Sequence, residues 1–161
     1  MKLAEELKIV PVLSDGDLNA GATLDGDSIN MKGQHHATFI VGLQALGVAS
    51  SHVKVFSGVT DGVKTSPLTF HYAFGGAATG SALADVLAAW ATSADLTLTH
   101  GTYDNYMLII EVDAADMDVN NDEEWLTIEF SDPDTGSTGN VQVHAILQPR
   151  YSGNRSQTVL A

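Results

Sequence analysis

Cysteine is absent from this sequence of 161 residues. Its absence excludes disulfides, zinc–cysteine centres, iron–sulfur clusters and cysteine nucleophiles. Basic residues are scarce as well, because 7 Lys and Arg stand against 20 Asp and Glu, which gives a net charge of −13 at pH 7. Nucleic acids and anionic membranes both require cationic surfaces on their partners. We therefore expect neither a nucleic acid nor a membrane as a partner.

Long apolar runs are missing too. No stretch approaches the roughly 20 apolar residues that a membrane-spanning helix needs. Glu5, Glu6 and Lys8 interrupt the N-terminal region, where a signal peptide would carry an unbroken apolar segment. We therefore expect a protein that is made inside a cell and is used or assembled there.

What the sequence does contain is the composition of a folded protein. Hydrophobic residues make up 44% of the chain and charged residues only 17%, which excludes a disordered acidic tail. The length is typical of one domain. The 15 glycines, together with many Ala, Thr, Ser, Asp and Asn residues, favour a β-rich fold with many turns.

Alternation of apolar and polar residues predicts most of the secondary structure. The clearest example is residues 68–74, where Leu and aromatic side chains alternate with Thr, His and Ala. Period-two patterns and turn signals predict further strands elsewhere. These lie at residues 28–32, 36–46, 51–58, 95–99, 106–112, 125–130 and 140–148, the last with Val141, Val143, Ala145 and Leu147 facing inward.

One segment has the periodicity of a helix instead of that of a strand. Residues 79–91 carry apolar side chains at i, i+3, i+4 and i+7, which is the spacing of one helical face, and Ser81 suits the N-cap position. The pattern predicts the one substantial helix of the chain. Its apolar face would consist of Leu83, Val86, Leu87 and Trp90.

Together these elements predict a mainly β fold. We expect a single-domain antiparallel β-sandwich or jelly-roll-like fold of about eight strands, with one short helix and extended N- and C-terminal segments. An N-terminal arm is predicted over residues 1–23, a sandwich body over 24–148 and a C-terminal tail over 149–161. Two Asp-Gly turn signals favour an arm or loop over residues 10–33, apart from the short strand.

Residues 75–81, with the sequence GGAATGS, have the glycine spacing of a phosphate-binding loop. The lysine that should follow the second glycine is missing, because Ser81 comes directly after Gly80. Without this cation, bound phosphates would lose their main charge partner. We interpret the segment as a flexible turn from a strand to a helix.

The acidic residues are unevenly distributed. Ten of the 20 lie between Glu111 and Asp134, and no Lys or Arg occurs between Lys64 and Arg150. We interpret this stretch as a solvated acidic surface.

A spacing within the stretch is similar to the start of a calcium-binding loop, namely Asp116-x-Asp118-x-Asn120. The pattern then fails, because Asn121 replaces the glycine at the sixth position and Thr127 replaces the glutamate at the twelfth. A solvated loop is the favoured interpretation, and weak calcium ligation by oxygen atoms is the alternative.

Six histidines are present, but no spacing joins them into a site. Two of them are adjacent, and in a strand they would point to opposite faces and could not chelate one metal together. Neither the HExxH metalloprotease motif nor the GxSxG nucleophile elbow occurs. We therefore expect no catalytic residues, no metal and no cofactor, and a protein that is not an enzyme. The six are His35, His36, His52, His71, His100 and His144.

Carboxylate pairs and aromatic residues are weaker signals. No spacing singles out two carboxylates for glycoside hydrolysis. The larger aromatic side chains fall mostly at core-facing or strand positions, which favours core packing over a platform for stacking sugars or bases. They are Tyr72, Trp90, Tyr103, Tyr106 and Trp125.

Three segments carry a resemblance to a known group of proteins. They are LDGDSINMKG at residues 24–33 followed by HHATFI at 35–40, TYDNYMLIIEVD at 102–113, and AILQPRYSGN at 145–154. Together they resemble small virion structural proteins encoded in the head-gene clusters of tailed bacteriophages and prophages. The similarity extends from about residue 20 to the C-terminus. Its motifs are structural and contain no catalytic residues.

The resemblance implies a minor capsid protein that binds the outer surface of the phage head as a decoration or cement protein and stabilises it. Its partner would be the major capsid protein, and a homo-oligomer, with a trimer favoured, is expected. It would be located on the capsid exterior after assembly in the host cytoplasm. An acidic body suits this place, because it complements basic patches on a shell and is repelled by packaged DNA. The terminal segments could order on neighbouring subunits.

A second hypothesis comes from another functional class. Trp125, Tyr103 and the acidic loop at residues 113–124 are compatible with a β-sandwich on the virion surface that binds carbohydrate or calcium. A head–tail or tail structural component is a further alternative.

Overall fold

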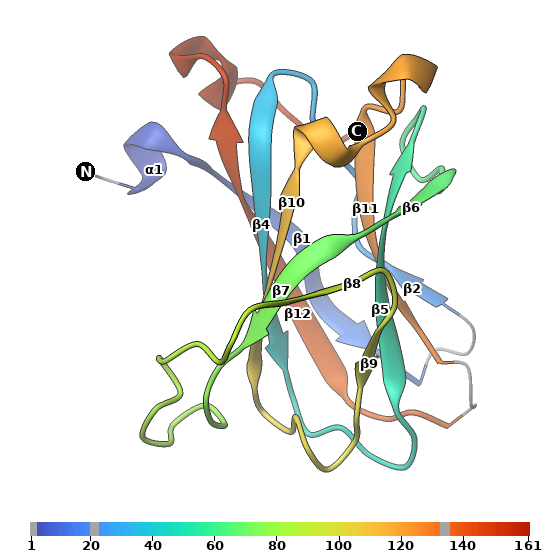
Figure 1. Ribbon diagram of the computed structural model, residues 1–161, viewed down its shortest axis with the longest axis vertical. Helices are drawn as coiled ribbons and strands as arrows, with labels where there is room; N and C mark the ends of the chain where they lie inside the picture. Colours follow the sequence, from blue (N-terminus) through green and yellow to red (C-terminus); the bar gives the residue numbers. More distant parts are fainter. Residues whose placement is uncertain (1–2, 20–22, 133–135) are drawn as a thin grey trace.

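The structure, a computed structural model, describes residues 3–19, 23–132 and 136–161. It is mainly β, with two antiparallel sheets that face one another (Figure 1). The predicted sandwich is therefore confirmed. The strands are β1 (Lys8–Asp17), β2 (Thr23–Asp25), β3 (Ile29–Asn30), β4 (Gln34–Leu43), β5 (Ser51–Gly58), β6 (Ser66–Leu68), β7 (Phe70–Phe74), β8 (Ala91–Ser93), β9 (Leu96–Leu98), β10 (Met107–Asp113), β11 (Trp125–Ser131) and β12 (Asn140–Pro149). The helical turns are α1 (Leu3–Glu6) and the 3₁₀ turns η1 (Ala114–Asp116), η2 (Val119–Asn121) and η3 (Ser152–Arg155).

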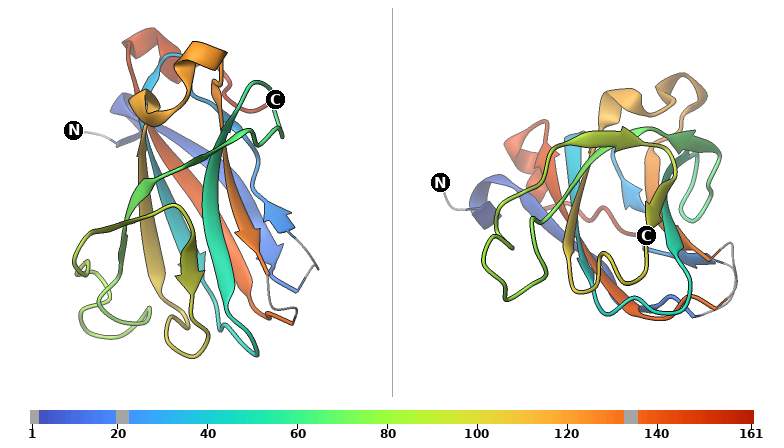
Figure 2. Two further views of the ribbon diagram at one scale, coloured as in Figure 1. Left: turned by 45° about the vertical axis from the view of Figure 1, so that its right-hand side comes forward. Right: turned by 60° about the horizontal axis from the view of Figure 1, so that its bottom comes forward.

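The first sheet has the strand order β1-β12-β4-β10-β7-β8, and the second has the order β2-β11-β5-β6. In the second sheet β3 also pairs with β11, and β9 also pairs with β5. Figure 2 shows how the sheets enclose one core while the connections gather at the two ends of the sandwich. In the described part of the chain no helix has the length and apolar character needed to cross a membrane.

The core lies between the sheets because alternate residues of each strand point inward. Phe39 of the first sheet and Phe130 of the second are among its largest members, and each is at most 1% exposed. In β12 the four residues predicted to face inward are all 0% exposed, and these are Val141, Val143, Ala145 and Leu147.

The N-terminal region differs from its prediction. Lys8–Asp17 forms β1, which pairs along β12 at the edge of the first sheet. The arm or loop expected over residues 10–17 is therefore wrong. Pro11 fits in this strand because an edge strand leaves one side of its backbone without ladder hydrogen bonds. Val10 and Val12 are at most 3% exposed, so β1 contributes to the core.

The helix predicted over residues 79–91 is also wrong. These residues form turns and irregular backbone that lead into β8. A helix of this length is marginal unless it packs an apolar face against the protein, and here the expected face is exposed to solvent. Gly80 and Leu83 have φ angles of 87° and 72°, which interrupt any helical turn. The structure instead holds one described α-helical turn, α1.

The strand predicted over residues 68–74 is divided between the two sheets. Leu68 ends β6, which pairs with β5 in the second sheet, and Phe70 begins β7, which pairs with β10 in the first. Thr69 is the corner between them. A chain that switches sheets at a bend keeps its apolar side chains inside on both sides of the bend. This one split, together with the additional strands β1, β2 and β8, raises the number of strands in the described residues to twelve from the expected eight.

Candidate functional site

The acidic stretch of the sequence builds a surface at one end of the sandwich. Strand β10 ends at Asp113, and the chain then makes the two turns η1 and η2 before β11 begins. We call residues 113–124 the acidic cap, and Figure 1 shows it in orange at the top of the molecule. Asp116 and Asp122 are exposed, and the side chain of Asp113 is 64% exposed. The cap therefore presents carboxylates to solvent.

Buried contacts fix the cap to the core. Ala114 and Met117 are 5% and 4% exposed and belong to the hydrophobic core. Glu123 is 2% exposed, and its two carboxylate oxygens accept hydrogen bonds from Ser57 Oγ at 2.5 Å and Ser66 Oγ at 3.0 Å. Buried carboxylates need such partners because desolvation penalises their charge. The acidic cap is thus a positioned surface of the sandwich.

Lys32 and Arg150 lie beside the cap, where they line one pocket together with Asp122. Lys32 Nζ lies 3.2 Å from Glu124 Oε1 at its margin, and both side chains are exposed. Asp113 contacts His36 through a hydrogen bond of 2.8 Å between Oδ1 and Nδ1. Within the described residues, no Lys or Arg forms an ion pair with the carboxylates of Asp113, Asp116 or Asp122. The exposed carboxylates of Asp116 and Asp122 are therefore available to a partner.

The residues with calcium-loop spacing are not brought around one point. Asp118 accepts a hydrogen bond from Asn121 Nδ2 at 2.7 Å, and Asp122 turns the chain with a left-handed φ of 57°. Among the residues that the structure describes, no three His, Asp or Glu side chains gather to hold a metal ion.

The glycine-rich segment after β7 is a turn without a helix behind it. The N–H of Gly75 donates to the Met107 carbonyl and that of Gly76 donates to the Val86 carbonyl. A Cβ at Gly76 would meet the Val86 oxygen at 2.9 Å, so glycine is required by close backbone packing. The Thr79 and Ser81 amides are also bonded to carbonyls. A phosphate would find carbonyl oxygens here and few unused N–H groups.

The histidines are dispersed over the sandwich. His36 bonds to Asp113 of the neighbouring strand, and His52 Nδ1 lies 2.6 Å from Asp95 Oδ1. Lys54 Nζ is 3.5 Å from the other oxygen of Asp95. The four remaining histidines are exposed, namely His35, His71, His100 and His144.

The aromatic residues fall into two groups. Tyr103 stacks on Phe74 at a centroid distance of 3.8 Å, and Tyr106 meets the Tyr103 ring edge-on, so these rings pack onto the protein as expected. Trp125 is partly buried in β11. Trp90 departs from the core packing expected for it, because it is 46% exposed.

Sequence reasoning missed a polar network on the outer face of β11. Thr127 and Glu129 alternate with the core residues of this strand, yet they are only 1% and 7% exposed. The connection between β5 and β6 reaches Glu129 through Lys64, whose Nζ lies 2.6 Å from Glu129 Oε2 and 2.8 Å from Asp25 Oδ2. Ser28 Oγ and Thr127 Oγ1 lie 2.6 Å apart. The sequence held one signal for this network, because Lys64 is the last Lys or Arg before a long segment that contains neither.

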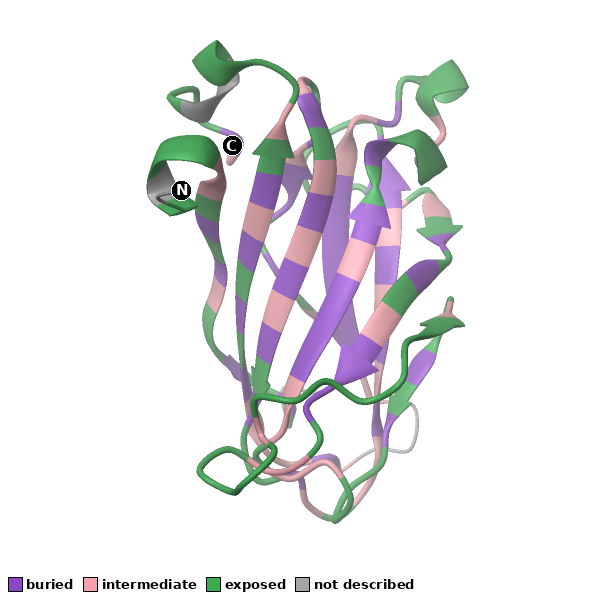
Figure 3. Cartoon of the chain, turned by 60° about the vertical axis from the view of Figure 1, so that its left-hand side comes forward, coloured by how far each residue is buried: buried purple, intermediate pink, exposed green. Residues whose placement is uncertain are grey.

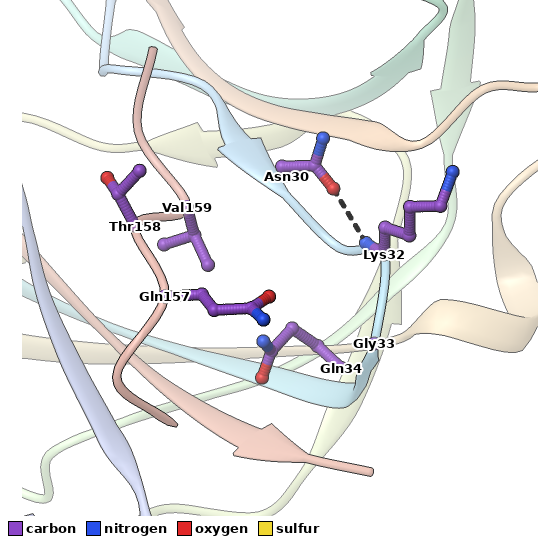
Figure 4. A pocket seen from close by; sticks show the side chains of 7 residues that line it. All are labelled: Asn30, Lys32, Gly33, Gln34, Gln157, Thr158 and Val159. Atoms are coloured by element: carbon purple, nitrogen blue, oxygen red, sulfur yellow. Dashed lines mark hydrogen bonds between the residues drawn. The ribbon is translucent and has the colours of Figure 1, made fainter. Parts of the chain in front are cut away.

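The C-terminal tail and the start of β4 line an open pocket of about 300 Å³. Gln34 and Gln157 point toward one another across it, and the Lys32 N–H donates to Asn30 Oδ1 at its rim (Figure 4). Gln34 is 1% exposed, and its Oε1 has no hydrogen-bond partner among the described residues. Val159 is 5% exposed. This part of the predicted C-terminal tail therefore packs on its own body.

Comparison with known proteins adds no relative, since no protein-family model matches the chain and no curated protein is significantly similar to it.

Proposed function

We propose that this protein is a structural component of a tailed-bacteriophage virion, bound to the outer surface of the head as a decoration or cement protein. The proposal rests on the resemblance of residues 24–40, 102–113 and 145–154 to small virion proteins. The observation that carries it is the acidic cap. The cap is anchored through Glu123 and exposes Asp113, Asp116 and Asp122, which form no ion pair with a Lys or Arg of the described residues.

A rigid charged surface of this kind suits adhesion to a large basic partner. Complementary charge increases the rate of encounter and fixes orientation. The buried partners of Glu123 hold the cap in place before binding, so little conformational entropy is lost on binding. The partner in this proposal is the major capsid protein, and the same net charge of −13 would repel packaged DNA.

The proposed role needs no reaction at the surface. Its effect is mechanical, because each bound copy would link shell subunits and oppose their separation. The protein would lie on the capsid exterior after assembly in the host cytoplasm.

Cryo-electron microscopy of the intact particle tests the location. The expected result is density for this chain on the outer face of the shell, in many copies. Density inside the shell, or in the tail or the head–tail connector, would overturn the proposal.

Binding to purified shells tests the acidic cap. Asp116→Asn combined with Asp122→Asn should weaken co-sedimentation and reduce its salt sensitivity. Asn tolerates the left-handed conformation of residue 122. The matched control is Asp27→Asn with Asp61→Asn, which removes the same charge at two exposed positions outside the cap. Equal losses in the two variants would show that net charge, and not the cap, drives attachment.

A further inference from the structure

An apolar segment projects from the sandwich at the end away from the acidic cap. Figures 1 and 2 show the connection between β7 and β8 extending beyond the sheets, and Figure 3 shows it and β8 largely as exposed residues. We call residues 83–93 the apolar edge. Its large side chains are solvent-accessible, with Leu83 63%, Val86 53%, Leu87 38% and Trp90 46% exposed. Clustered apolar exposure of this kind marks interaction surfaces.

The conformation at the start of the apolar edge is strained. Leu83 has a φ of 72°, in the left-handed region that is unfavourable for a bulky side chain. Its carbonyl accepts the N–H of Val86 at 3.0 Å, so the strain closes a tight turn. The turn leaves the Leu83 side chain 63% exposed, so it gains little packing within the monomer. Backbone strain at a residue whose side chain packs little within the monomer is typical of sites that act on a partner.

The backbone of the apolar edge offers a strand for pairing. Leu87 bridges to Gly75, and Ala91–Ser93 pairs with β7, so the segment runs along the margin of the first sheet. In the described part of the chain, β8 is the last strand of that sheet, and its outer side pairs with no other strand. Such margins readily accept a second chain.

Natural proteins protect strands of this kind with proline, charge or a covering element. Six strands of the described chain pair on one side only and stand at sheet ends, namely β1 and β8 in the first sheet and β2, β3, β6 and β9 in the second. Three of them carry such protection, with Pro11 in β1, Pro67 in β6 and Asp25 in β2. The segment from Leu87 to Ser93 contains neither a proline nor a charge. Strands β3 and β9 contain neither as well, but the Asn30 N–H of β3 donates to the Val159 carbonyl of the C-terminal tail, and β9 buries both of its leucines. The segment from Leu87 to Ser93 differs from them because it exposes large apolar side chains, those of Leu87 and Trp90.

The distribution of charge over the chain indicates which partner would bind the apolar edge. Asp85 is the one charged residue among residues 65–94, in a chain of net charge −13. A basic partner would be attracted to the acidic cap, whereas another copy of this chain is repelled there and meets little repulsion at the apolar edge. We propose that the apolar edge is the self-association surface of this protein, where β8 pairs antiparallel with β8 of a second copy.

A strand that pairs antiparallel with itself generates a two-fold contact, in which each residue meets its partner symmetrically. The contact would continue the first sheet across two molecules and cover Leu87 and Trp90. It closes as a dimer, in contrast to the trimer implied by the resemblance. It needs no shell, so it stands independently of the proposed capsid role.

The test measures the association state of the purified full chain by sedimentation equilibrium over a wide concentration range. The wild type should be a reversible dimer. Trp90→Glu should raise the dissociation constant at least tenfold, about 1.4 kcal/mol, as expected of a central interface aromatic. The matched control is Val119→Glu, which adds the same charge at an apolar position that is 61% exposed in the acidic cap, and it should leave the constant unchanged. Leu83→Glu is the second variant if Trp90→Glu fails to fold.

Hydrogen exchange gives an independent measurement, because pairing should slow the amides of residues 91–93 as concentration rises. A monomer at all concentrations, a trimer, or equal weakening by Trp90→Glu and Val119→Glu would overturn the inference. Failure of shell binding with an intact dimer would refute only the proposed function, so the two outcomes are separable.

Discussion

Lys64 Nζ lies 2.6 Å from Glu129 Oε2, across the outer face of the second sheet. The same ammonium group is 2.8 Å from Asp25 Oδ2, so one side chain joins the β5–β6 connection, β11 and β2. Glu129 is 7% exposed, which is unusual for a carboxylate on the outer face of a sandwich. Because of this contact, the Glu129 side chain on the outer face of β11 lies under the β5–β6 connection and forms part of a covered polar layer.

Lys64→Met should destabilise the fold by roughly 1–3 kcal/mol, because the variant leaves a largely buried carboxylate without its cation. Urea denaturation at neutral pH measures the loss. The matched control is Lys32→Met, which removes an ion pair with Glu124 in which the lysine side chain is 75% exposed. An exposed pair of this kind contributes at most about 1 kcal/mol. Similar losses in both variants would show that Lys64 has no special structural role.

The contacts of Lys64 also predict that its contribution to stability depends on pH in the alkaline range. Desolvation by burial acts to lower the pKa of Lys64, but hydrogen bonds and charge attraction from Asp25 and Glu129 outweigh it and raise the pKa above its ordinary value of 10.5. A raised pKa in the folded state means that the contribution is fully present below the unfolded value and disappears as the pH rises through the folded value. The stability difference between wild type and Lys64→Met should be constant near neutrality and shrink above about pH 10.5. A difference that is unchanged by alkaline titration would contradict this assignment.

Period-two patterns predicted the parts of the fold in which burial alone decides the conformation. Strand β5 has the expected bounds, and β12 buries all four of the residues predicted to face inward. In these strands one face is apolar, so a shift by one residue would expose the whole set. The sandwich itself follows from such strands, because each must cover its apolar face with another sheet.

Other features depend on contacts that no local pattern reveals. The helical periodicity of residues 79–91 describes an apolar face, but the described chain supplies no surface against which that face packs. Thr69 separates two strands that belong to different sheets, although the alternation continues through it. Pairing between β1 and β12 joins residues more than 120 positions apart, and the Lys64 contacts likewise join distant segments. Such long-range contacts set the strand order and the covered polar layer.

The buried carboxylate under the acidic cap gives a third prediction. Glu123→Ala should destabilise the protein by about 2–3 kcal/mol, because it leaves Ser57 Oγ without a partner at a residue that is 0% exposed. The adjacent Glu124 has a side chain that is 37% exposed, and Glu124→Ala should stay within roughly 1 kcal/mol. Chemical denaturation separates the two. Near-equal values would mean that Glu123 does not hold the cap to the core.

The fourth prediction concerns the C-terminal tail, which packs on the core of the sandwich through Val159 and Leu160. The carbonyl of Val159 accepts the N–H of Asn30 at 2.8 Å, and its side chain is 5% exposed within the core. Val159→Ala should therefore lower the free energy of unfolding by about 1–2 kcal/mol, since it removes two buried methyl groups. Val159→Asp should do more and should also release the Asn30 amide to faster hydrogen exchange. The matched control is Val119→Ala, at a position that is 61% exposed, where the loss should stay within about 0.5 kcal/mol. If the two alanine variants unfold alike and the Asn30 amide keeps its protection in Val159→Asp, the tail would not be docked through Val159, and residues 157–161 would be free to act as an arm on a neighbouring subunit.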